Sequence, residues 1–190
     1  MFRDVTKESL HVPDVLKVKH TLTRLIQTMK TPRYGPVLMD LPVNIQMSSL
    51  EGLQPSRILS TKSHQKHIYD ISKYVQESKR PLVIFGHGVK LAGATKEALE
   101  FVEKNGLPFL VSWGAFDICG TNHPLRVGSP GVYGDRYANY AIQNADLLIS
   151  IGSRLDSRQI GGNAALFSKH SKKIMVDIDD HEITKMGEKG

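Results

Sequence analysis

Cysteine is almost missing from this sequence, and long hydrophobic runs are missing altogether. Its 190 residues hold one cysteine, Cys119, which excludes an internal disulfide framework and favours a reducing compartment. No apolar run approaches the roughly 20 residues that a membrane helix needs, and the first residues lack the apolar core of a signal peptide. We therefore expect a cytoplasmic protein with no membrane partner.

A concentrated basic surface is also missing. The net charge is +6, but the lysines and arginines are scattered, with no cluster beyond Lys79-Arg80 and Lys172-Lys173. Tyrosines are not interleaved with basic residues, as a surface that stacks nucleic-acid bases requires. We therefore expect no nucleic-acid partner.

Patterns typical of catalysis and of metal binding are absent as well. The histidines lack the spacing of metal ligands, so we expect no metal site. Ser112 and Cys119 have no recognisable base beside them that would make a nucleophile. Asp177 and Asp179 share a face of a predicted strand but have no further partner. We predict no catalytic residue in this chain.

The sequence does contain strands and helices in alternation. The predicted strands, each apolar throughout, cover residues 81–85, 108–112, 147–151 and 173–179. Three helices, each with one apolar face, are predicted. One begins at Ser63, and the other two cover residues 92–104 and 135–144. A long irregular stretch, rich in glycine and proline, is expected at residues 113–130. Alternation of this kind indicates an α/β fold in which helices cover both faces of a doubly wound parallel sheet.

The first part of the chain predicts a second, partial α/β domain. A helix is expected over residues 14–29 and a short strand at Val37–Asp40. One helix and one strand cannot bury a core of their own, so residues 1–46 would belong to another domain. Residues 47–62 lack periodicity and predict a linker. Residues 63–190 would then form the main domain.

Glycines and polar residues gather where the predicted strands end, at Gly86-His-Gly88, Ser112-Trp113, Gly131-Val-Tyr133, Gly152-Ser-Arg154 and Asp177-Ile178. The carboxyl ends of parallel strands meet at one edge of a sheet, where open α/β folds bind their ligands. A nucleotide is the ligand that such an edge favours. We expect Arg154 and Arg158 to bind phosphates through their planar guanidinium groups.

Each of these residues also has a purely structural interpretation. Gly86-His-Gly88 is not a complete Gly-x-Gly-x-x-Gly fingerprint and would equally suit a tight turn needed for packing. Either arginine would equally pair with Asp156 or Asp135. Asp177 would bind a ribose or an adenine amino group, or would cap a helix. Trp113 would lie in the core or at a domain contact.

Three motifs of the sequence resemble those of the thiamine diphosphate enzymes of the acetolactate synthase large-subunit group. The resemblance is carried by Gly131-Val-Tyr-Gly-Asp-Arg-Tyr-Ala-Asn-Tyr-Ala141, by Ala145-Asp-Leu-Leu-Ile-Ser-Ile-Gly-Ser-Arg-Leu-Asp-Ser-Arg158 and by Val176-Asp-Ile-Asp179. It implies that residues 63–190 are the central domain. Gly35-Pro-Val-Leu-Met-Asp-Leu-Pro-Val-Asn-Ile-Gln46 resembles the end of the pyrimidine-binding domain, and Val5-Thr-Lys7 the approach to its last helix.

The resemblance implies that this domain binds FAD or ADP. Carried over motif by motif, the cofactor-binding residues would be Gly86, Gly88, Ser112, Trp113, Pro130, Gly131, Val132, Tyr133, Gly152, Ser153, Arg154, Leu155, Asp156, Arg158, Asp177 and Ile178. Two departures keep ADP open beside FAD. Val132-Tyr133 replaces the usual Met-His, and Asp156-Ser157-Arg158 replaces Asp-Asp-Arg.

For a complete enzyme, the resemblance implies decarboxylation of a 2-keto acid and carboligation in branched-chain amino acid biosynthesis. Thiamine diphosphate and Mg²⁺ would be bound by a glutamate and a Gly-Asp-Gly motif that this sequence does not contain. We therefore expect a fragment that is inactive alone and works with the remaining domains in a homodimer or homotetramer. The alternatives are a 2-keto acid decarboxylase without FAD, a carboligase of surface-sugar synthesis, a stand-alone nucleotide-binding module and a nicotinamide dehydrogenase.

Overall fold

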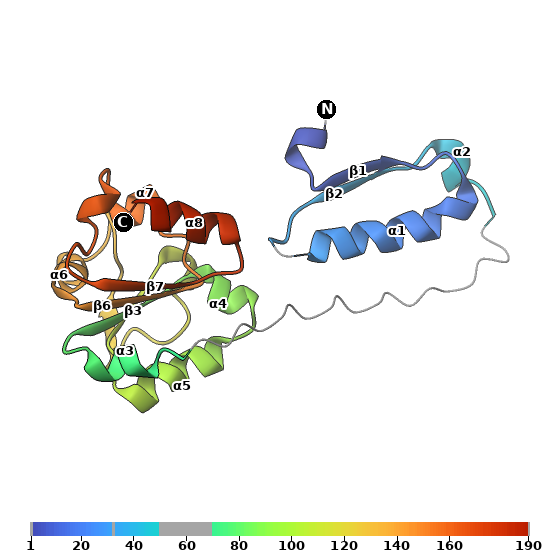
Figure 1. Ribbon diagram of the computed structural model, residues 1–190. Helices are drawn as coiled ribbons and strands as arrows, with labels where there is room; N and C mark the ends of the chain where they lie inside the picture. The colour runs from blue at the N-terminus through green and yellow to red at the C-terminus, as the bar shows by residue number, and fades with distance from the viewer. Residues whose placement is uncertain (1, 32, 50–69, 190) are drawn as a thin grey trace. The chain divides into compact units, whose positions relative to one another are not determined.

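In the computed structural model, residues 2–31, 33–49 and 70–189 are described, and the chain divides into two compact units, residues 1–67 and 68–190. The elements of the first unit, shown in Figure 1, are a 3-10 helix (Arg3–Val5), β1 (Glu8–His11), α1 (Val15–Lys30), β2 (Val37–Asp40) and α2 (Val43–Gln46).

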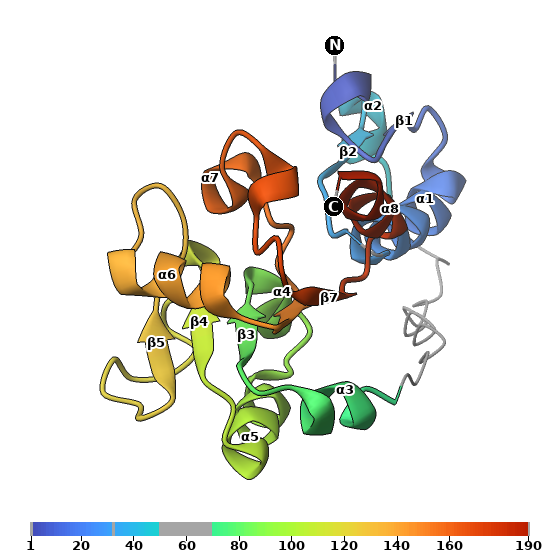
Figure 2. The same cartoon turned by 60° about the vertical axis from the view of Figure 1, so that its left-hand side comes forward.

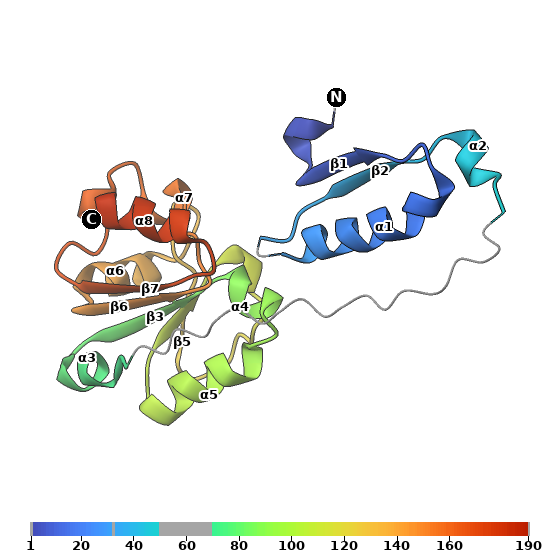
Figure 3. The same cartoon turned by 45° about the vertical axis from the view of Figure 1, so that its right-hand side comes forward.

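Helix α1 covers one face of a parallel strand pair in the first unit (Figures 1 and 3). The side chain of Asp14 caps the helix by accepting a hydrogen bond from the backbone N–H of Leu16. Leu25 is the helix residue that is fully buried. The predicted helix and the predicted strand at Val37–Asp40 are confirmed. Strand β1 was not predicted, because Glu8–His11 holds a single aliphatic residue.

The second unit contains the helices and strands from α3 to α8. They are α3 (Ser72–Glu77), β3 (Pro81–Phe85), α4 (His87–Leu91), α5 (Thr95–Asn105), β4 (Phe109–Val111), a 3-10 helix η2 (Trp113–Ala115), β5 (Arg126–Gly128), α6 (Arg136–Asn144), β6 (Leu147–Ile151), α7 (Ser157–Ile160), a 3-10 helix η3 (Ala164–Leu166), β7 (Lys172–Val176) and α8 (Asp180–Lys189).

Five strands of this unit form one parallel sheet in the order β5-β4-β3-β6-β7. Helices α6, α7 and α8 lie on one side of the sheet, and α3 and α5 lie on the other (Figures 2 and 3). The predicted doubly wound α/β fold is confirmed. The strand order reverses between β3 and β6, and this switch point is where open α/β sheets form a crevice.

The two faces of the sheet carry separate cores. On one face Phe85 and Phe109 pack against Val102 of α5. On the other face Ile84 and Leu148 pack against Ile142 of α6. Burial on both faces explains why β3 and β6 are apolar at nearly every position.

Several element boundaries differ from the prediction. Gly86-His-Gly88 is not a bare turn, because α4 begins at His87. Strand β5 lies inside the stretch expected to be irregular, and its three residues are too few to show a pattern. Strand β7 ends at Val176, so Asp177 and Asp179 follow the strand and do not share one of its faces. Helix α8 was not predicted.

The helix expected from Ser63 begins outside the described residues, which resume at residue 70 with α3 close behind. Helix α5 is capped at its C-terminus by Gly106, which adopts a left-handed conformation with φ +61°. None of the helices in the described parts combines the length and the apolar character that crossing a lipid bilayer requires.

Candidate functional site

Three glycines, Gly86, Gly88 and Gly152, bring the backbone segments after β3 and β6 into contact at the switch point. The backbone N–H of Gly88 donates to the carbonyl oxygen of Gly152 over 2.9 Å, and the N–H of Gly86 donates to Ile151 over 2.9 Å. A Cβ atom on Gly86 would lie 2.1 Å from the Gly152 oxygen, and one on Gly88 would lie 2.8 Å from the Gly152 Cα. The absence of side chains here is therefore required by contact between the chain's own backbone segments.

The sixteen sequence-predicted residues differ widely in what they offer to a ligand. The exposed ones are Trp113, Val132, Tyr133, Arg154, Arg158 and Ile178. The partly buried ones are Gly88, Gly152, Asp156 and Asp177. The buried ones are Gly86, Ser112, Pro130, Gly131, Ser153 and Leu155. Side-chain recognition therefore rests on the first two groups.

The loop after β5 is held in place by side chains of α6. The amide of Asn139 makes two hydrogen bonds with Gly131, one accepted from its N–H and one donated to its carbonyl, each 2.9 Å long. Gly131 has φ +112°, and a Cβ atom there would lie 2.6 Å from the Arg158 carbonyl oxygen. This clamp explains the Gly131–Asn139 spacing of the motif.

An exposed aromatic side chain of this loop lies beside a second exposed aromatic side chain. The rings of Tyr133 and Trp113 have centroids 6.0 Å apart and are tilted by 31°. The two residues are 76% and 52% exposed, so both side chains are in contact with solvent. Trp113 is therefore not a core residue, and the pair offers a surface on which a planar ring system can stack.

Asp156 acts as the cap of α7. Its Oδ1 accepts hydrogen bonds from the backbone N–H groups of Arg158, at 2.9 Å, and Gln159, at 3.2 Å. This carboxylate therefore caps the helix, in place of the ion pair with Arg154 or Arg158 that the sequence left open. Gln159 also accepts a hydrogen bond from the buried hydroxyl of Ser153, at 3.0 Å.

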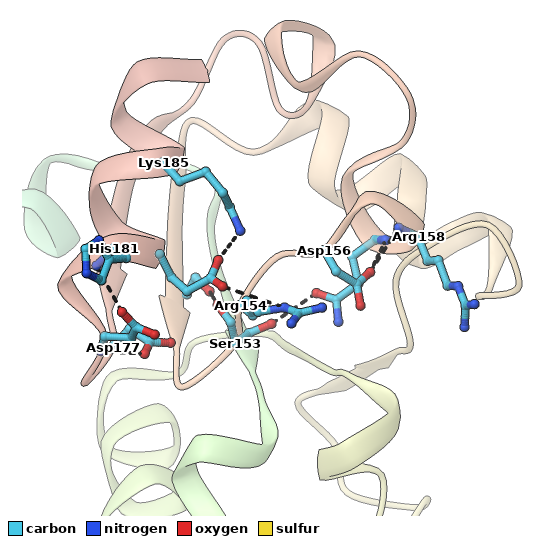
Figure 4. A network of polar contacts seen from close by, with 11 residues as sticks. Ser153, Arg154, Asp156, Arg158, Asp177, His181 and Lys185 are labelled. Carbon is cyan, nitrogen blue, oxygen red and sulfur yellow. Dashed lines mark hydrogen bonds and ion pairs between the residues drawn. The ribbon is translucent and has the colours of Figure 1, made fainter. Parts of the chain in front are cut away.

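The two arginines of the motif serve different grooves. Arg154 lines a groove of about 590 Å³ together with residues of α7, η3 and α8. Arg158 lines a smaller groove of about 230 Å³ with Gly131, Val132 and Asn139. In Figure 4 Arg154 lies beside α8, whereas Arg158 projects away from it. Joint binding of one phosphate by both arginines is therefore not supported.

Helix α8 adds site residues that the sequence reasoning missed. Glu182 is paired with Arg154, with 4.0 Å between Nε and Oε1, and with Lys185 (Figure 4). Asp177 accepts a hydrogen bond from the N–H of Asp179 over 3.0 Å, and Asp179 accepts one from His181 over 3.0 Å. These turns begin the helix. The available signal was Glu182 three residues before Lys185, a spacing that pairs side chains on a helix.

One side chain of α6 has a shifted pKa. Desolvation, helped by the carboxylate of Asp135, raises the pKa of Tyr137 above its ordinary value. Within the described ranges, no three acidic, histidine or cysteine side chains are grouped so that they could hold a metal ion.

Comparison with known proteins agrees with this architecture. Residues 68–189 match the family described as thiamine pyrophosphate enzyme, central domain. The chain belongs to this family. The match covers the whole five-stranded sheet together with helices α3 to α8.

Relatives of this central domain are similar to the chain at about 30% identity. A probable acetolactate synthase large subunit of Methanococcus aeolicus is 31% identical over 97% of this chain and 32% of its own length. The acetolactate synthase large subunit of Corynebacterium glutamicum is 34% identical over 96% and 30%. The 2-hydroxyacyl-CoA lyase 1 of Dictyostelium discoideum is 32% identical over 92% and 30%. The chain thus spans about a third of the length of these relatives, and the predicted resemblance to acetolactate synthase large subunits is confirmed.

Proposed function

We propose that this chain is the nucleotide-binding central part of an acetolactate synthase-like thiamine diphosphate enzyme. Two acetolactate synthase large subunits among the relatives described above support the enzyme class. The proposed reaction of the complete enzyme is decarboxylation of a 2-keto acid followed by carboligation to a second carbonyl compound. The central domain would contribute nucleotide binding and the spacing of the catalytic domains.

One observation carries the nucleotide proposal. The loops after β4, β5 and β6 meet at a single sheet edge and expose the Trp113–Tyr133 ring pair together with Arg154 and Arg158. A nucleotide needs these two kinds of partner, since its base stacks on aromatic rings and its phosphates bind guanidinium groups. FAD and ADP share the adenosine diphosphate that this edge would recognise.

The described residues provide no group of ligands that suits the Mg²⁺ ion of thiamine diphosphate. The sequence has no Gly-Asp-Gly motif, and the described residues form no acidic cluster for a divalent ion. We therefore place their ligands on the remaining domains and subunits of a homo-oligomeric enzyme. The chain alone, mixed with thiamine diphosphate, Mg²⁺ and pyruvate, is then expected to form no acetolactate.

The test of nucleotide binding is a spectrum and a titration of the purified chain. If FAD is the ligand, dialysis against FAD leaves a flavin absorption band with the protein; if ADP is the ligand, the protein stays colourless and calorimetry detects ADP. Arg158→Ala and Arg154→Ala should each weaken binding by about tenfold, the value of a charge-assisted hydrogen bond.

Lys169→Ala is the matched control for these variants. Lys169 is an exposed cation that precedes β7. It therefore lies near the amino end of that strand, whereas the proposed site lies at the carboxyl ends of the strands. Its removal lowers the net charge by the same amount but should leave nucleotide affinity unchanged. A chain that binds neither FAD nor ADP would refute the proposed binding role.

A second candidate has support from one relative. The similarity to a 2-hydroxyacyl-CoA lyase favours a thiamine diphosphate lyase as the complete enzyme. Cleavage of a 2-hydroxyacyl-CoA by the complete enzyme, without formation of acetolactate from pyruvate, would favour this candidate over an acetolactate synthase.

A further inference from the structure

A histidine that precedes β5 is largely buried and lies outside the proposed nucleotide site. The side chain of His123 is only 14% exposed. Its ring lies edge-on against the ring of Phe109 in the core, with 5.1 Å between the ring centroids. A histidine changes its pattern of donors and acceptors when it takes up a proton. We propose that His123 is a pH-sensitive switch, which holds the start of β5 in place when neutral and releases it when protonated.

Two hydrogen bonds define the protonation state of the His123 ring. Nδ1 accepts a hydrogen bond from the backbone N–H of Leu125 over 3.2 Å, so this nitrogen carries no proton. Nε2 lies 3.0 Å from Oε1 of Glu103, which is an acceptor, so Nε2 carries the proton. A neutral imidazole with its proton on Nε2 satisfies both partners. The bond to Leu125 copies the turn that an asparagine or aspartate side chain makes with the N–H two residues on.

A second proton on the ring breaks this arrangement. Nδ1 then becomes a donor, and it faces the N–H of Leu125, which is also a donor. The half-buried N–H loses its acceptor, which costs more free energy than a satisfied hydrogen bond contributes. The gain is an ion pair with Glu103, but this side chain is 53% exposed, and exposed ion pairs are weak. Protonation of the ring therefore disfavours the turn.

The charged groups on the neighbouring elements do not reverse this sign. On α5 the group that faces the ring is Glu103, and on β4 it is the uncharged Phe109. On β5 the guanidinium group of Arg126 donates to the carbonyls of Phe116 and Cys119, at 3.1 and 3.0 Å. A cation three residues along the chain opposes a second positive charge on His123, so it acts in the same direction as the lost hydrogen bond.

The turn matters because it leads into β5. The N–H of Arg126 donates to the His123 carbonyl over 3.0 Å, and the Leu125 carbonyl accepts from the N–H of Phe109 over 2.9 Å. Strand β5 lies at the end of the sheet, beside β4, and runs into the loop that carries Tyr133. Release of the turn should loosen β5 as the pH falls from about 8 to about 5, the range in which histidines take up a proton. The switch does not depend on nucleotide binding.

The experiment is amide hydrogen exchange of the whole chain, followed by NMR between about pH 8 and about pH 5. Rates are corrected for the pH dependence of exchange in an unfolded chain. The amides of Leu125 and Phe109 should lose about tenfold in protection at the acid end, the value of one hydrogen bond to a buried group. The amide of Gly86, which donates to Ile151 between β3 and β6, should keep its protection.

His123→Asn is the variant that isolates the switch. The side-chain oxygen of asparagine accepts the Leu125 N–H in the same kind of turn but cannot take up a proton. Protection at Leu125 should then be independent of pH. Glu103→Gln should instead enlarge the acid loss, because the protonated ring no longer gains an ion pair. His170→Asn is the matched control, since His170 is an exposed histidine of the same unit, and it should behave as the wild type.

Three outcomes would overturn the proposal. The first is a wild-type His123 ring whose nitrogen chemical shifts place the proton on Nδ1 at neutral pH. The second is wild-type protection of Leu125 that does not change with pH. The third is a His123→Asn protein that loses this protection in acid as the wild type does. The first two need no variant, so the proposal stays testable if a substitution prevents folding.

Discussion

The carbonyl oxygen of Gly152 fills the space that a side chain on Gly86 would need, 2.1 Å from the position of its Cβ atom. The contact joins the ends of β3 and β6, the two strands on either side of the switch point. It also receives support from the hydrogen bond between Gly88 and Gly152. The glycines of Gly86-His-Gly88 thus hold the sheet edge together, whatever binds above it.

Gly86→Ala should destabilise the second unit severely. A Cβ atom so close to backbone atoms forces β3 and β6 apart, at a cost of about 3 kcal/mol or more in the free energy of unfolding. Urea unfolding followed by circular dichroism measures the effect. Gly120→Ala is the control, because a Cβ atom there meets nothing within 4 Å and the φ of Gly120 is not positive; it should stay within about 0.5 kcal/mol of the wild type. A Gly86→Ala protein as stable as the wild type would show that this contact is absent.

Asp146 should make stability depend on acid pH. Its carboxylate accepts hydrogen bonds from the hydroxyl of Ser78 and from the backbone N–H groups of Lys79 and Arg80, the latter two at 2.9 Å. These bonds lower its pKa to about 2. A group with a lowered pKa stabilises the folded state above its unfolded value, about 3.9, and loses that contribution as the pH falls to about 2.

Asp146→Asn is the variant that isolates this contribution. At pH 7 it should lose about 1 to 2 kcal/mol, after allowance for solvent screening of a partly exposed group. The difference from the wild type should shrink steadily between pH 4 and pH 2. Glu97→Gln, a surface carboxylate of the same unit, serves as the control. A difference independent of pH would assign the loss to packing alone.

Glu182→Gln should strengthen nucleotide binding. The substitution removes the carboxylate that competes with phosphate for Arg154 and Lys185 but keeps the size of the side chain. Charge pairs near a surface contribute up to about 1 kcal/mol, so the affinity for ADP should rise by about threefold to fivefold. Calorimetry at two salt concentrations checks it. Weaker binding would mean that Glu182 contacts the ligand directly.

The sheet could be predicted from the sequence because its central strands are buried on both faces. Residues 81–85 and 147–151 are apolar for that reason and match β3 and β6 residue for residue. Strands β1 and β5 escaped prediction because they are short, with one aliphatic residue in Glu8–His11 and three residues in Arg126–Gly128.

The arrangement of the site was only partly predictable. Strand ends gathered at one edge as expected for a parallel sheet, but the direction of each side chain depended on distant partners. Gly86 owes its residue type to Gly152, far along the chain. Arg154 and Arg158 serve different grooves because Asp156 starts a helix between them. Lys185 enters the groove from α8, which no motif had indicated.

The most direct test uses Trp113, the single tryptophan of the chain. It lies in the exposed ring pair at the proposed site, so its fluorescence reports on that edge alone. Titration with FAD or with ADP should change this fluorescence along a saturating curve that levels off at one nucleotide per chain. Fluorescence that shows no saturable change with either nucleotide would contradict nucleotide binding at this edge of the sheet.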